Sequence, residues 1–441
     1  MTAVLRLRKV RGVALLCLTA PPVNALSADL LSALAVTFDD LHHDSAIKAV
    51  ILLAEGKFFS AGADLRDLGT GAAASLRAVC ARIEGFDRPV IAAMQGMALG
   101  GGAELALAAH YRLAAPDAAL GLPEVTLGLV PGAGATQRLP RLVGADMALR
   151  ILRGGHPVWP EEGRRIGLID GVISGDVPSA AVAFADGILA RSAGPRPTRA
   201  RRDRLADGSA YLACVAQHRK AARAGPELAP ARIVDCVEAA LVLPFATGLA
   251  FEAQALEDCL AHPQSRALRH IFLAERRISD QLLVRDTAAN IPTAPGVAVV
   301  AELCRALQQA VVWLRDQGHS PASIDATLCG FGFAAGPGGG TYAGPQNPVI
   351  LRRCLAALLG HGTRLVARGA VARVSDIDAL AVHGPALGFP RLWGGPMRAA
   401  QLLGLPGFRA DMRAWMLQDP VWSVSPLLDR AAQVAGGLDV S

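Results

Sequence analysis

One segment organises the first half of the chain, and it reads Gln95-Gly-Met-Ala-Leu-Gly-Gly-Gly-Ala-Glu-Leu105. Three consecutive glycines, at positions 100 to 102, precede a helix that we expect from Gly102 to about His110. At the start of a helix the backbone N–H groups lack internal partners, and the helix dipole is positive. Bare glycine backbone there predicts a place where an anionic oxygen is stabilised. Glu104 falls in the first turn of this helix, where an acid can also serve only to compensate the dipole.

Two other segments of the chain add small residues and a second acid. The first, Gly56-Lys-Phe-Phe-Ser-Ala-Gly-Ala-Asp-Leu65, follows an expected strand, and its small residues let the backbone approach a ligand. The second is Leu122-Pro-Glu-Val-Thr-Leu-Gly-Leu-Val-Pro-Gly-Ala-Gly-Ala-Thr-Gln-Arg138, in which apolar residues surround Glu124. Such surroundings raise the pKa of a carboxyl group toward the range useful for proton transfer. Each segment alone suits an ordinary turn or a surface helix start, but the three together indicate an active site.

The pattern around these segments is that of an α/β domain. Expected strands and helices alternate from residue 1 to about residue 125. Residues 13–18 and 49–53 are short apolar runs suited to buried strands, and Ser27 is expected to cap a helix that runs to about His42. We interpret the start of the chain as two strands joined at Arg11-Gly12 rather than as a signal peptide.

From about residue 230 onward the pattern is nearly all helical. Residues 248–286 form a long amphipathic stretch, and a faint repeat follows it. In each copy of the repeat an apolar helix stops at a glycine and an Ile-Asp-Ala motif follows, at Ile324 and again at Ile377. The sequence therefore predicts an α/β domain followed by an all-α region of two similar helical subdomains. The four expected parts are a domain at 1–195, a connector with linker helices at 196–290, and helical subdomains at 291–345 and 346–441.

Composition excludes several classes of partner. The net charge of +6 comes almost wholly from arginines spread along the chain, and the densest basic stretch, residues 196–204, contains no aromatic residue. We interpret that stretch as a solvated connector and expect no nucleic-acid partner. No uninterrupted apolar run approaches the ~20 residues that cross a bilayer, so we expect no membrane partner. Eight scattered cysteines favour buried thiols in a reducing, cytoplasmic compartment and no metal site.

The three segments together resemble the crotonase (enoyl-CoA hydratase/isomerase) superfamily over about residues 1–195. The resemblance rests on Ser60-Ala-Gly-Ala-Asp64, on Ala98-Leu-Gly-Gly-Gly-Ala-Glu104 and on Pro123-Glu-Val-Thr-Leu-Gly-Leu-Val-Pro-Gly-Ala-Gly134. It implies an α/β domain built as a spiral of ββα units. It also implies an acyl-CoA thioester as substrate and hydratase chemistry that needs no cofactor.

The resemblance further implies a role for individual residues. The N–H groups of Ala61 and Gly101 would form the oxyanion hole for the thioester carbonyl. Glu104 would deprotonate the water that attacks C3, and Glu124 would protonate C2. The same arrangement could also move a double bond between C3 and C2, so isomerase activity stays open. The other residues implied at the substrate and CoA site are Ala63, Asp64, Arg66 and Gly132.

Residues 245–441 resemble the fatty-acid β-oxidation multifunctional enzymes, in which a crotonase domain is fused to a 3-hydroxyacyl-CoA dehydrogenase. Residues 265–276 resemble the linker helix of those enzymes, and the two later repeats resemble their helical dehydrogenase subdomains. Those enzymes place an NAD-binding domain between linker and subdomains, whereas only about ten residues, 290–299, lie there in this chain. We find no strand followed by G-x-G-x-x-G and a helix. We therefore expect no NAD site and no dehydrogenase activity.

Other functions remain open beside the hydratase. The chain could be a catalytically quiet CoA-binding or scaffolding subunit, as the altered back half suggests, or could run a crotonase-type reaction on an unusual acyl-CoA. Two intact carboxylates and a glycine-rich hole argue against the quiet subunit. Self-association or a β-oxidation partner enzyme is also compatible with the linker helix.

Overall fold

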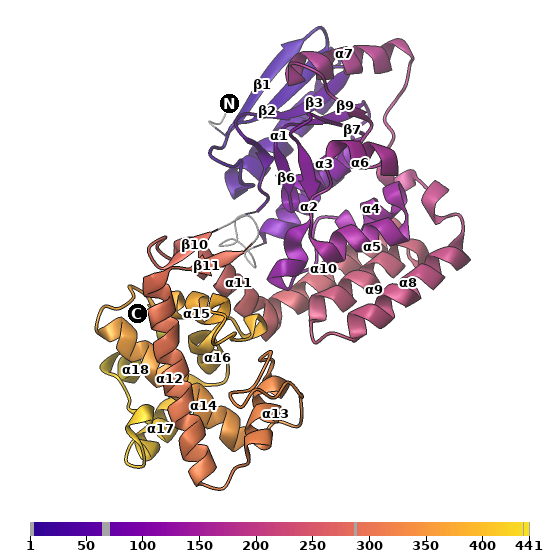
Figure 1. Cartoon of the computed structure of the whole chain (residues 1–441). Helices are drawn as coiled ribbons and strands as arrows, with labels where there is room; N and C mark the ends of the chain where they lie inside the picture. The colour runs from indigo at the N-terminus through magenta and orange to yellow at the C-terminus, as the bar shows by residue number, and fades with distance from the viewer. Residues whose placement is uncertain (1–3, 64–70, 286–288, 435, 441) are drawn as a thin grey trace. The chain divides into compact units, whose positions relative to one another are not determined.

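The computed structural model describes residues 4–63, 71–285, 289–434 and 436–440 (Figure 1). The chain divides into two compact units, Met1–Ala261 and His262–Ser441, which we call the N-terminal and C-terminal units. The sequence predicts boundaries at residues 195 and 290, whereas the two compact units of the structure meet at residue 261. The stretch after residue 195 was expected to be a connector because it is rich in arginine, glycine and proline. It folds into helices that carry apolar side chains and belong to the N-terminal unit.

The main sheet of the N-terminal unit has six strands in the order β1-β2-β3-β5-β7-β9. β1 and β2 pair antiparallel, and the other neighbours pair parallel. Arg11 and Gly12 have φ of 47° and 79°, the left-handed backbone that a tight two-residue hairpin turn requires. The strands are β1 (Leu5–Val10), β2 (Val13–Leu18), β3 (Ala49–Ala54), β5 (Val90–Met94), β7 (Tyr111–Ala114) and β9 (Gly171–Val172).

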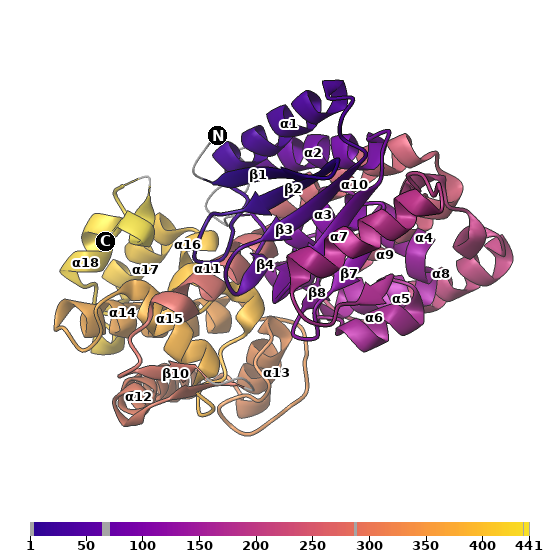
Figure 2. The ribbon, with the colours of Figure 1, turned by 90° about the horizontal axis from the view of Figure 1, so that it is seen from above.

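Helices cover the two faces of this sheet. Figure 2 shows α1 (Ala28–His43) on one side and α7 (Val177–Ala190) on the other. Alternate strand residues such as Leu15, Ile51 and Ile91 share one apolar cluster with α7, as the two-residue period of a strand dictates. Ser27 caps α1 by accepting a hydrogen bond from the Leu30 N–H, as the sequence predicts.

A second, smaller sheet positions the three segments singled out in the sequence. Its strands are β4 (Phe58–Ser60), β6 (Met97–Leu99) and β8 (Ala119–Gly121), in that order and all parallel. Parallel strands place their carboxyl ends at the same edge of a sheet. The turns that follow the three strands therefore meet, although they lie up to 60 residues apart in the chain.

The remaining helices of the N-terminal unit follow the small sheet or pack around it. α9 buries Ile233, Val234 and Val237 completely, so the helices beyond residue 195 belong to this core. These elements are α2 (Ala72–Gly85), α3 (Gly101–Ala108), η2 (Pro123–Leu127), α4 (Ala135–Val143), α5 (Ala145–Gly154), α6 (Pro160–Ile166), η3 (Thr198–Ala200), η4 (Asp203–Leu205), α8 (Gly208–Arg223), α9 (Leu228–Val242) and α10 (Phe245–Ala261).

The C-terminal unit is helical apart from one short hairpin. Residues 248–286, expected as one long amphipathic stretch, contain a break where Pro263 starts a new helix and the His262 side chain caps it. The elements are α11 (Pro263–Arg277), β10 (Leu283–Arg285), β11 (Asn290–Pro292), α12 (Ala294–Asp316), α13 (Pro321–Phe331), α14 (Pro348–Ala367), α15 (Val374–His383), η5 (Arg391–Trp393), α16 (Pro396–Leu402), α17 (Leu405–Trp415), η6 (Pro420–Trp422), α18 (Pro426–Ala431) and η7 (Gly437–Val440).

One apolar core runs through the C-terminal unit. It includes Leu303 and Leu314 of α12, Leu355 of α14 and Leu380 of α15. The halves expected at 291–345 and 346–441 share this core, so their separation into two similar subdomains stays a prediction. α12 is long and apolar enough to cross a membrane by length and composition, and it is the one such helix among the described residues. Its apolar face is buried in this core, so we interpret it as a core helix.

Candidate active site

The site lies where the turns after β4, β6 and β8 meet. Glycine is required at this meeting point because the backbones touch. A Cβ on Gly102 would lie 2.5 Å from the Ser60 carbonyl oxygen, and a Cβ on Gly62 would lie 2.7 Å from the Leu99 carbonyl oxygen. Gly62 also has a φ of +85°, which other residues rarely adopt. The close approach holds the turn after β4 against the N-terminus of α3.

The N–H group of Ala61, expected in the oxyanion hole, is engaged elsewhere. It donates to the Val23 carbonyl oxygen at 2.9 Å, and the next N–H, that of Gly62, donates to the Ser60 hydroxyl at 3.1 Å. The structure therefore corrects this expectation. The N–H of Ala63 is the next one along the turn, and its nitrogen lies 3.6 Å from the point that a Cβ on Gly101 would occupy. No described residue accepts the N–H of Ala63 or Gly101.

Glu104 projects from α3, all of whose residues are buried. Its Oε1 accepts hydrogen bonds from the backbone N–H groups of Ala133 at 2.7 Å and Ala135 at 3.2 Å. Burial raises the pKa of Glu104, while these two bonds and the charges of Arg138 and Arg77 act in the opposite direction. The carboxyl group is thus buried but has donors that stabilise its ionised form.

Glu124 lies in η2, directly after β8, and its carboxyl group has a different environment. Oε1 lies 3.2 Å from the point that a Cβ on Gly100 would occupy, at the start of α3. Oε2 is enclosed and meets no hydrogen-bond donor among the described residues, although the residue as a whole is only half-buried. Burial, followed by the negative charge of Glu104, raises the pKa of Glu124 to about 8. This carboxyl group therefore keeps its proton at neutral pH.

A third buried carboxyl group, that of Glu252 on α10, joins the two that the sequence predicts. Its Oε1 accepts the Gly134 N–H at 2.6 Å, and its Oε2 accepts the Thr136 N–H at 2.9 Å and contacts the Thr136 hydroxyl at 2.5 Å. Burial, followed by the negative charge of Glu104, raises the pKa of Glu252 to about 8. Glu252 was not among the site residues predicted from the sequence. Its spacing with Gly248, Ala255, Leu256 and Cys259 on the buried face of α10 could have indicated it.

The turn at residues 132–136 binds these side chains and is itself held firmly. Arg77 of α2 donates twice to the Gly132 carbonyl oxygen, at 3.0 and 2.9 Å. Arg138 donates to the Ala133 carbonyl oxygen at 2.7 Å and forms a buried ion pair with Glu84 at 2.9 Å. The amide groups of the turn are thereby fixed in direction.

A cavity of about 380 Å³ lies between α2 and α10. Small side chains line much of it, among them Ala73 and Ala74 of α2 and Ala250 and Ala253 of α10. A Cβ on Gly132 would lie 2.4 Å from a methyl group of Leu256, which also lines the cavity. The cavity therefore adjoins the turn that holds Glu104.

The structure brings together Glu104, Glu124, Gly101 and Ala63 of the expected site. Gly132 lies on the adjoining turn, with its carbonyl oxygen bound to Arg77. Asp64 and Arg66, expected at the CoA site, lie outside the described residues. Their part in CoA binding stays a prediction.

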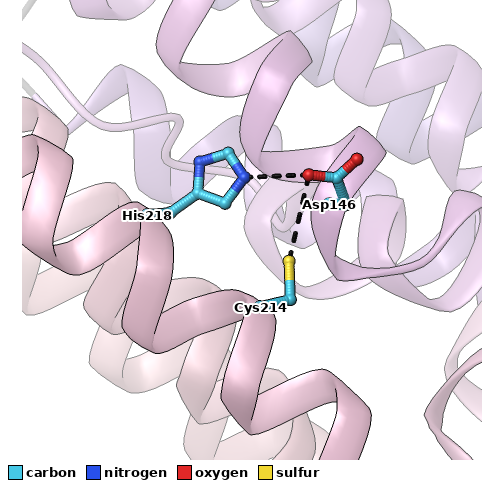
Figure 3. A group of neighbouring side chains, drawn as sticks. All are labelled: Asp146, Cys214 and His218. Atoms are coloured by element: carbon cyan, nitrogen blue, oxygen red, sulfur yellow. Dashed lines mark hydrogen bonds and ion pairs between the residues drawn. The ribbon is translucent and has the colours of Figure 1, made fainter.

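A second cluster of polar side chains lies between α5 and α8 (Figure 3). His218 Nε2 lies 3.0 Å from Asp146 Oδ1, and Cys214 Sγ lies 4.0 Å from the same oxygen. Arg153 donates to His218 Nδ1 at 3.0 Å, so Nε2 carries the hydrogen and donates to Asp146. Arg150 pairs with Asp146 at 2.9 Å. Two guanidinium charges beside the cluster disfavour a divalent cation, and we interpret it as an ion-pair network that fastens α8 to α5.

Comparisons with known proteins show which family part of this chain matches. Residues 8–194 match the family described as Enoyl-CoA hydratase/isomerase. The chain is 38% identical over 275 residues to a peroxisomal bifunctional enzyme from Danio rerio, which covers 60% of this chain and 37% of that protein. It is 46% identical over 165 residues to a probable enoyl-CoA hydratase from Bacillus subtilis (strain 168), which covers 36% of this chain and 64% of that protein.

Among solved structures, an enoyl-CoA hydratase from Bacillus anthracis is 28% identical and has a TM-score of 0.42, covering 61% of this chain and 96% of that one. The chain spans less than half the length of the bifunctional relatives that it matches first. Their alignments cover about 60% of this chain or slightly more. Residues 8–194 belong to the enoyl-CoA hydratase/isomerase family, and they form an α/β crotonase domain followed in the chain by an all-α C-terminal region.

Proposed function

We propose that this protein adds water across the double bond of trans-2-enoyl-CoA thioesters. One observation carries the proposal: two carboxyl groups, those of Glu104 and Glu124, lie beside one glycine-rich helix N-terminus, and backbone amides bind Glu104, whereas an enclosed oxygen of Glu124 has no donor among the described residues. Glu104 accepts two backbone amides, which favours the anion. Glu124 has a pKa of about 8 and an oxygen without a donor among the described residues, which favours the acid. Hydration needs one base and one acid, and the site supplies both.

In the proposed reaction Glu104 acts as the base and Glu124 as the acid. Glu104 takes a proton from water as the water oxygen bonds to C3. The π electrons of the C2–C3 bond move toward the thioester carbonyl, whose oxygen becomes an enolate oxygen held by the N–H groups of Ala63 and Gly101. C2 then takes the proton of Glu124, and the carbonyl forms again to give a 3-hydroxyacyl thioester. A proton passes from Glu104 back to Glu124, directly or through solvent, before the next turnover.

The hole that we propose uses Ala63 in place of Ala61, with Gly101 as its partner. The N–H of Gly101 lies at the positive end of α3, where the dipole adds to the hydrogen bond. One donor in such a hole is worth about 3 kcal/mol of transition-state stabilisation. The carbonyl of the thioester is thus the group that the helix N-terminus recognises.

The cavity between α2 and α10 suits the acyl chain. Leu256 and the alanines of both helices give it an apolar wall, and its volume is about 380 Å³. It adjoins the turn at residues 132–136, so a chain that extends from C3 would enter it. The CoA part of the substrate would then lie toward Ala63, and Asp64 and Arg66 remain proposed contacts for it.

The same two carboxyl groups could also support isomerisation. In its ionised form, Glu124 would take a proton from one carbon of the acyl chain and return it to another, while the hole holds the enolate. The family that residues 8–194 match includes both activities. A reaction on an unusual acyl-CoA and a quiet CoA-binding or scaffolding role remain the alternatives to test.

We propose that the activity needs no cofactor and that the C-terminal unit lacks dehydrogenase activity. The relatives' names include bifunctional enzymes of the peroxisome, and the chain spans only part of their length. For this chain we propose the cytoplasm, since its eight cysteines are thiols that suit a reducing compartment. Self-association or a partner enzyme of β-oxidation is proposed for the C-terminal unit.

The test is the loss of the conjugated thioester absorbance when the full chain meets short- and medium-chain trans-2-enoyl-CoA. Glu104→Gln and Glu124→Gln should each lower kcat by about 10²- to 10⁴-fold, the range of general acid–base catalysis. Glu162→Gln, an exposed acid on α6, is the matched control and should leave kcat unchanged.

Several results would contradict the proposal. Binding of CoA esters without turnover by the wild type would favour the quiet subunit. Turnover that survives both Gln variants would exclude the two-carboxylate mechanism. Reduction of NAD in the presence of a 3-hydroxyacyl-CoA would show that dehydrogenase activity is retained.

A further inference from the structure

Glu252 and Glu104 bind alternate amides of one short turn. The N–H groups of Ala133 and Ala135 donate to Glu104, and those of Gly134 and Thr136 donate to Glu252. Successive N–H groups thus point to two carboxyl groups on opposite sides of the turn. The direction of each amide toward Glu104 is fixed by the neighbouring amide that binds Glu252.

The chain reaches this arrangement from far away in sequence. Glu252 lies 116 residues beyond Thr136, on α10, and its side chain is completely buried. Helix α4 starts at Ala135, and its N-cap residue, Gly134, has no side chain with which to cap it. A cap alone is usually supplied by a local serine, threonine or aspartate. A distant carboxyl group adds a titratable group that a local hydroxyl cap would not.

The partners of Glu252 also set it apart from an ordinary buried acid. Glu84, buried in the same unit, has the guanidinium of Arg138 as its ion partner. Glu252 has only backbone amides and a hydroxyl among the described residues, as Glu104 has only amides. Burying an acid without a cation costs stability, and such acids gather at functional sites.

We propose that Glu252 is a positioning residue for the hydration reaction, because it holds the turn at residues 133–136 in the orientation that directs the Ala133 and Ala135 amides at the Glu104 carboxylate. This inference rests on the proposed function. Glu252 does not touch the substrate in this role. It acts by holding the turn, and when it is ionised its charge also affects the pKa of Glu124.

The charge effect has a definite sign. Above its own pKa of about 8, Glu252 carries a negative charge that disfavours a negative charge on Glu124, so on the basic side of the pH profile it helps Glu124 to keep its proton. Removing that charge should lower the pKa of Glu124. The titratable and charged groups that face Glu252 are Glu104, Glu124, Arg138, Cys80 and Cys236.

The experiment compares Glu252→Gln with the wild type in the hydratase assay across pH 6 to 10. We expect kcat to fall by about 10- to 100-fold with KM within about twofold, since a misdirected base weakens the chemical step more than binding. The basic limb of the pH profile should move to lower pH. Thr136→Val, which removes one contact of Glu252, should show the same changes in smaller measure, and Thr136→Ser should behave as the wild type.

Each outcome decides the inference. A folded Glu252→Gln protein with wild-type kcat and pH profile would overturn it, and so would a loss of kcat that only follows the fraction of unfolded protein by circular dichroism. If Glu252→Gln does not fold, a wild-type profile in Thr136→Val overturns it instead. If the wild type hydrates no enoyl-CoA, the proposed function fails separately from this inference.

Carboxyl ¹³C NMR then tests the role of Glu252 without the assay. The inference requires that Glu252→Gln shifts the pKa at which Glu104 or Glu124 titrates.

Discussion

Buried acidic side chains of this protein differ in their partners, and Glu275 and Asp378 of the C-terminal unit differ in this way from the acids of the candidate active site. In the C-terminal unit, Glu275 contacts His383 Nε2 at 2.7 Å and Arg391 Nη2 at 3.1 Å. Asp378 contacts His270 Nε2 at 2.8 Å. In the N-terminal unit, Glu104 and Glu252 are bound by neutral donors, and one oxygen of Glu124 has no donor among the described residues.

The pKa shifts of Glu275 and Glu124 follow their partners, whereas burial raises the pKa of Asp378 in spite of its contact with His270. Burial alone would raise the pKa of Glu275, but the hydrogen bonds from His383 and Arg391 outweigh it, and the pKa is lowered. The pKa of Glu124 is raised, because no cation opposes burial and the charge of Glu104. An acid with a cation beside it serves the fold, whereas an acid kept from cations remains able to exchange a proton.

The largest expected effect is on the reaction. Glu104→Gln should lower kcat by about 10²- to 10⁴-fold and leave the thermal midpoint of unfolding at or above that of the wild type, because a buried charge without a cation is removed. Calorimetry beside the absorbance assay measures both. A large loss of stability in this variant would place Glu104 with the structural acids and break the comparison.

The next prediction tests whether the ion partner of a buried acid, or the unit in which the acid lies, decides its role. Glu84 lies in the N-terminal unit but pairs with Arg138, and both side chains are 1% exposed. Glu84→Gln leaves that guanidinium buried without its charge partner, so it should cost about 3 kcal/mol of stability. Urea unfolding measures the loss. Unchanged stability would mean that the unit, and not the ion partner, decides the role of a buried acid.

A smaller effect is expected in the C-terminal unit. Glu275→Gln should lower the stability by about 1 to 2 kcal/mol, less than Glu84→Gln because Arg391 is 40% exposed and can bind water. Hydratase kcat should remain within about twofold of the wild type, a change too small for a lost catalytic group. A loss of kcat without a loss of stability would link this pair to the reaction.

The smallest expected effect is on how steeply the free energy of unfolding changes with pH. The folded pKa of Glu124 lies above its unfolded value, so its contribution to stability is present at low pH and is lost as pH rises through about 8. Glu124→Gln removes this titration. The free energy of unfolding, measured with urea, should fall between pH 5 and pH 9 in both proteins. The fall should be smaller in the variant than in the wild type, by at least about 1 kcal/mol. Parallel curves would show that Glu124 has an ordinary pKa.

Local patterns in the sequence were enough for much of the fold and part of the site. Short apolar runs predict β2 and β3, and the three glycines at positions 100 to 102 predict the start of α3 to within one residue. Glu104 and Glu124 follow from their positions next to glycine and proline. Each of these signals lies within about ten residues of the feature that it predicts.

The contacts that sequence reasoning missed are long-range. The carbonyl oxygen of Val23 accepts a hydrogen bond from the Ala61 N–H, 38 positions away in the chain, and no local pattern predicts that bond. Glu252 reaches its turn across more than a hundred positions. Helix α8 lies in the stretch that we interpreted as a connector, because its arginines hide a buried face that includes Tyr211 and Val215.

The position of α10 has a consequence for any attempt to move the proposed activity into another gene. The family match ends at residue 194, but the folding unit ends at Ala261, and the last helix of that unit supplies Glu252. A fragment cut at residue 195 would expose the face of α4 that α9 covers and would leave the turn at residues 133–136 held from one side only. A fragment designed to carry the proposed hydratase activity should therefore extend through Ala261. It would be longer than the segment that matches the family, which ends at residue 194.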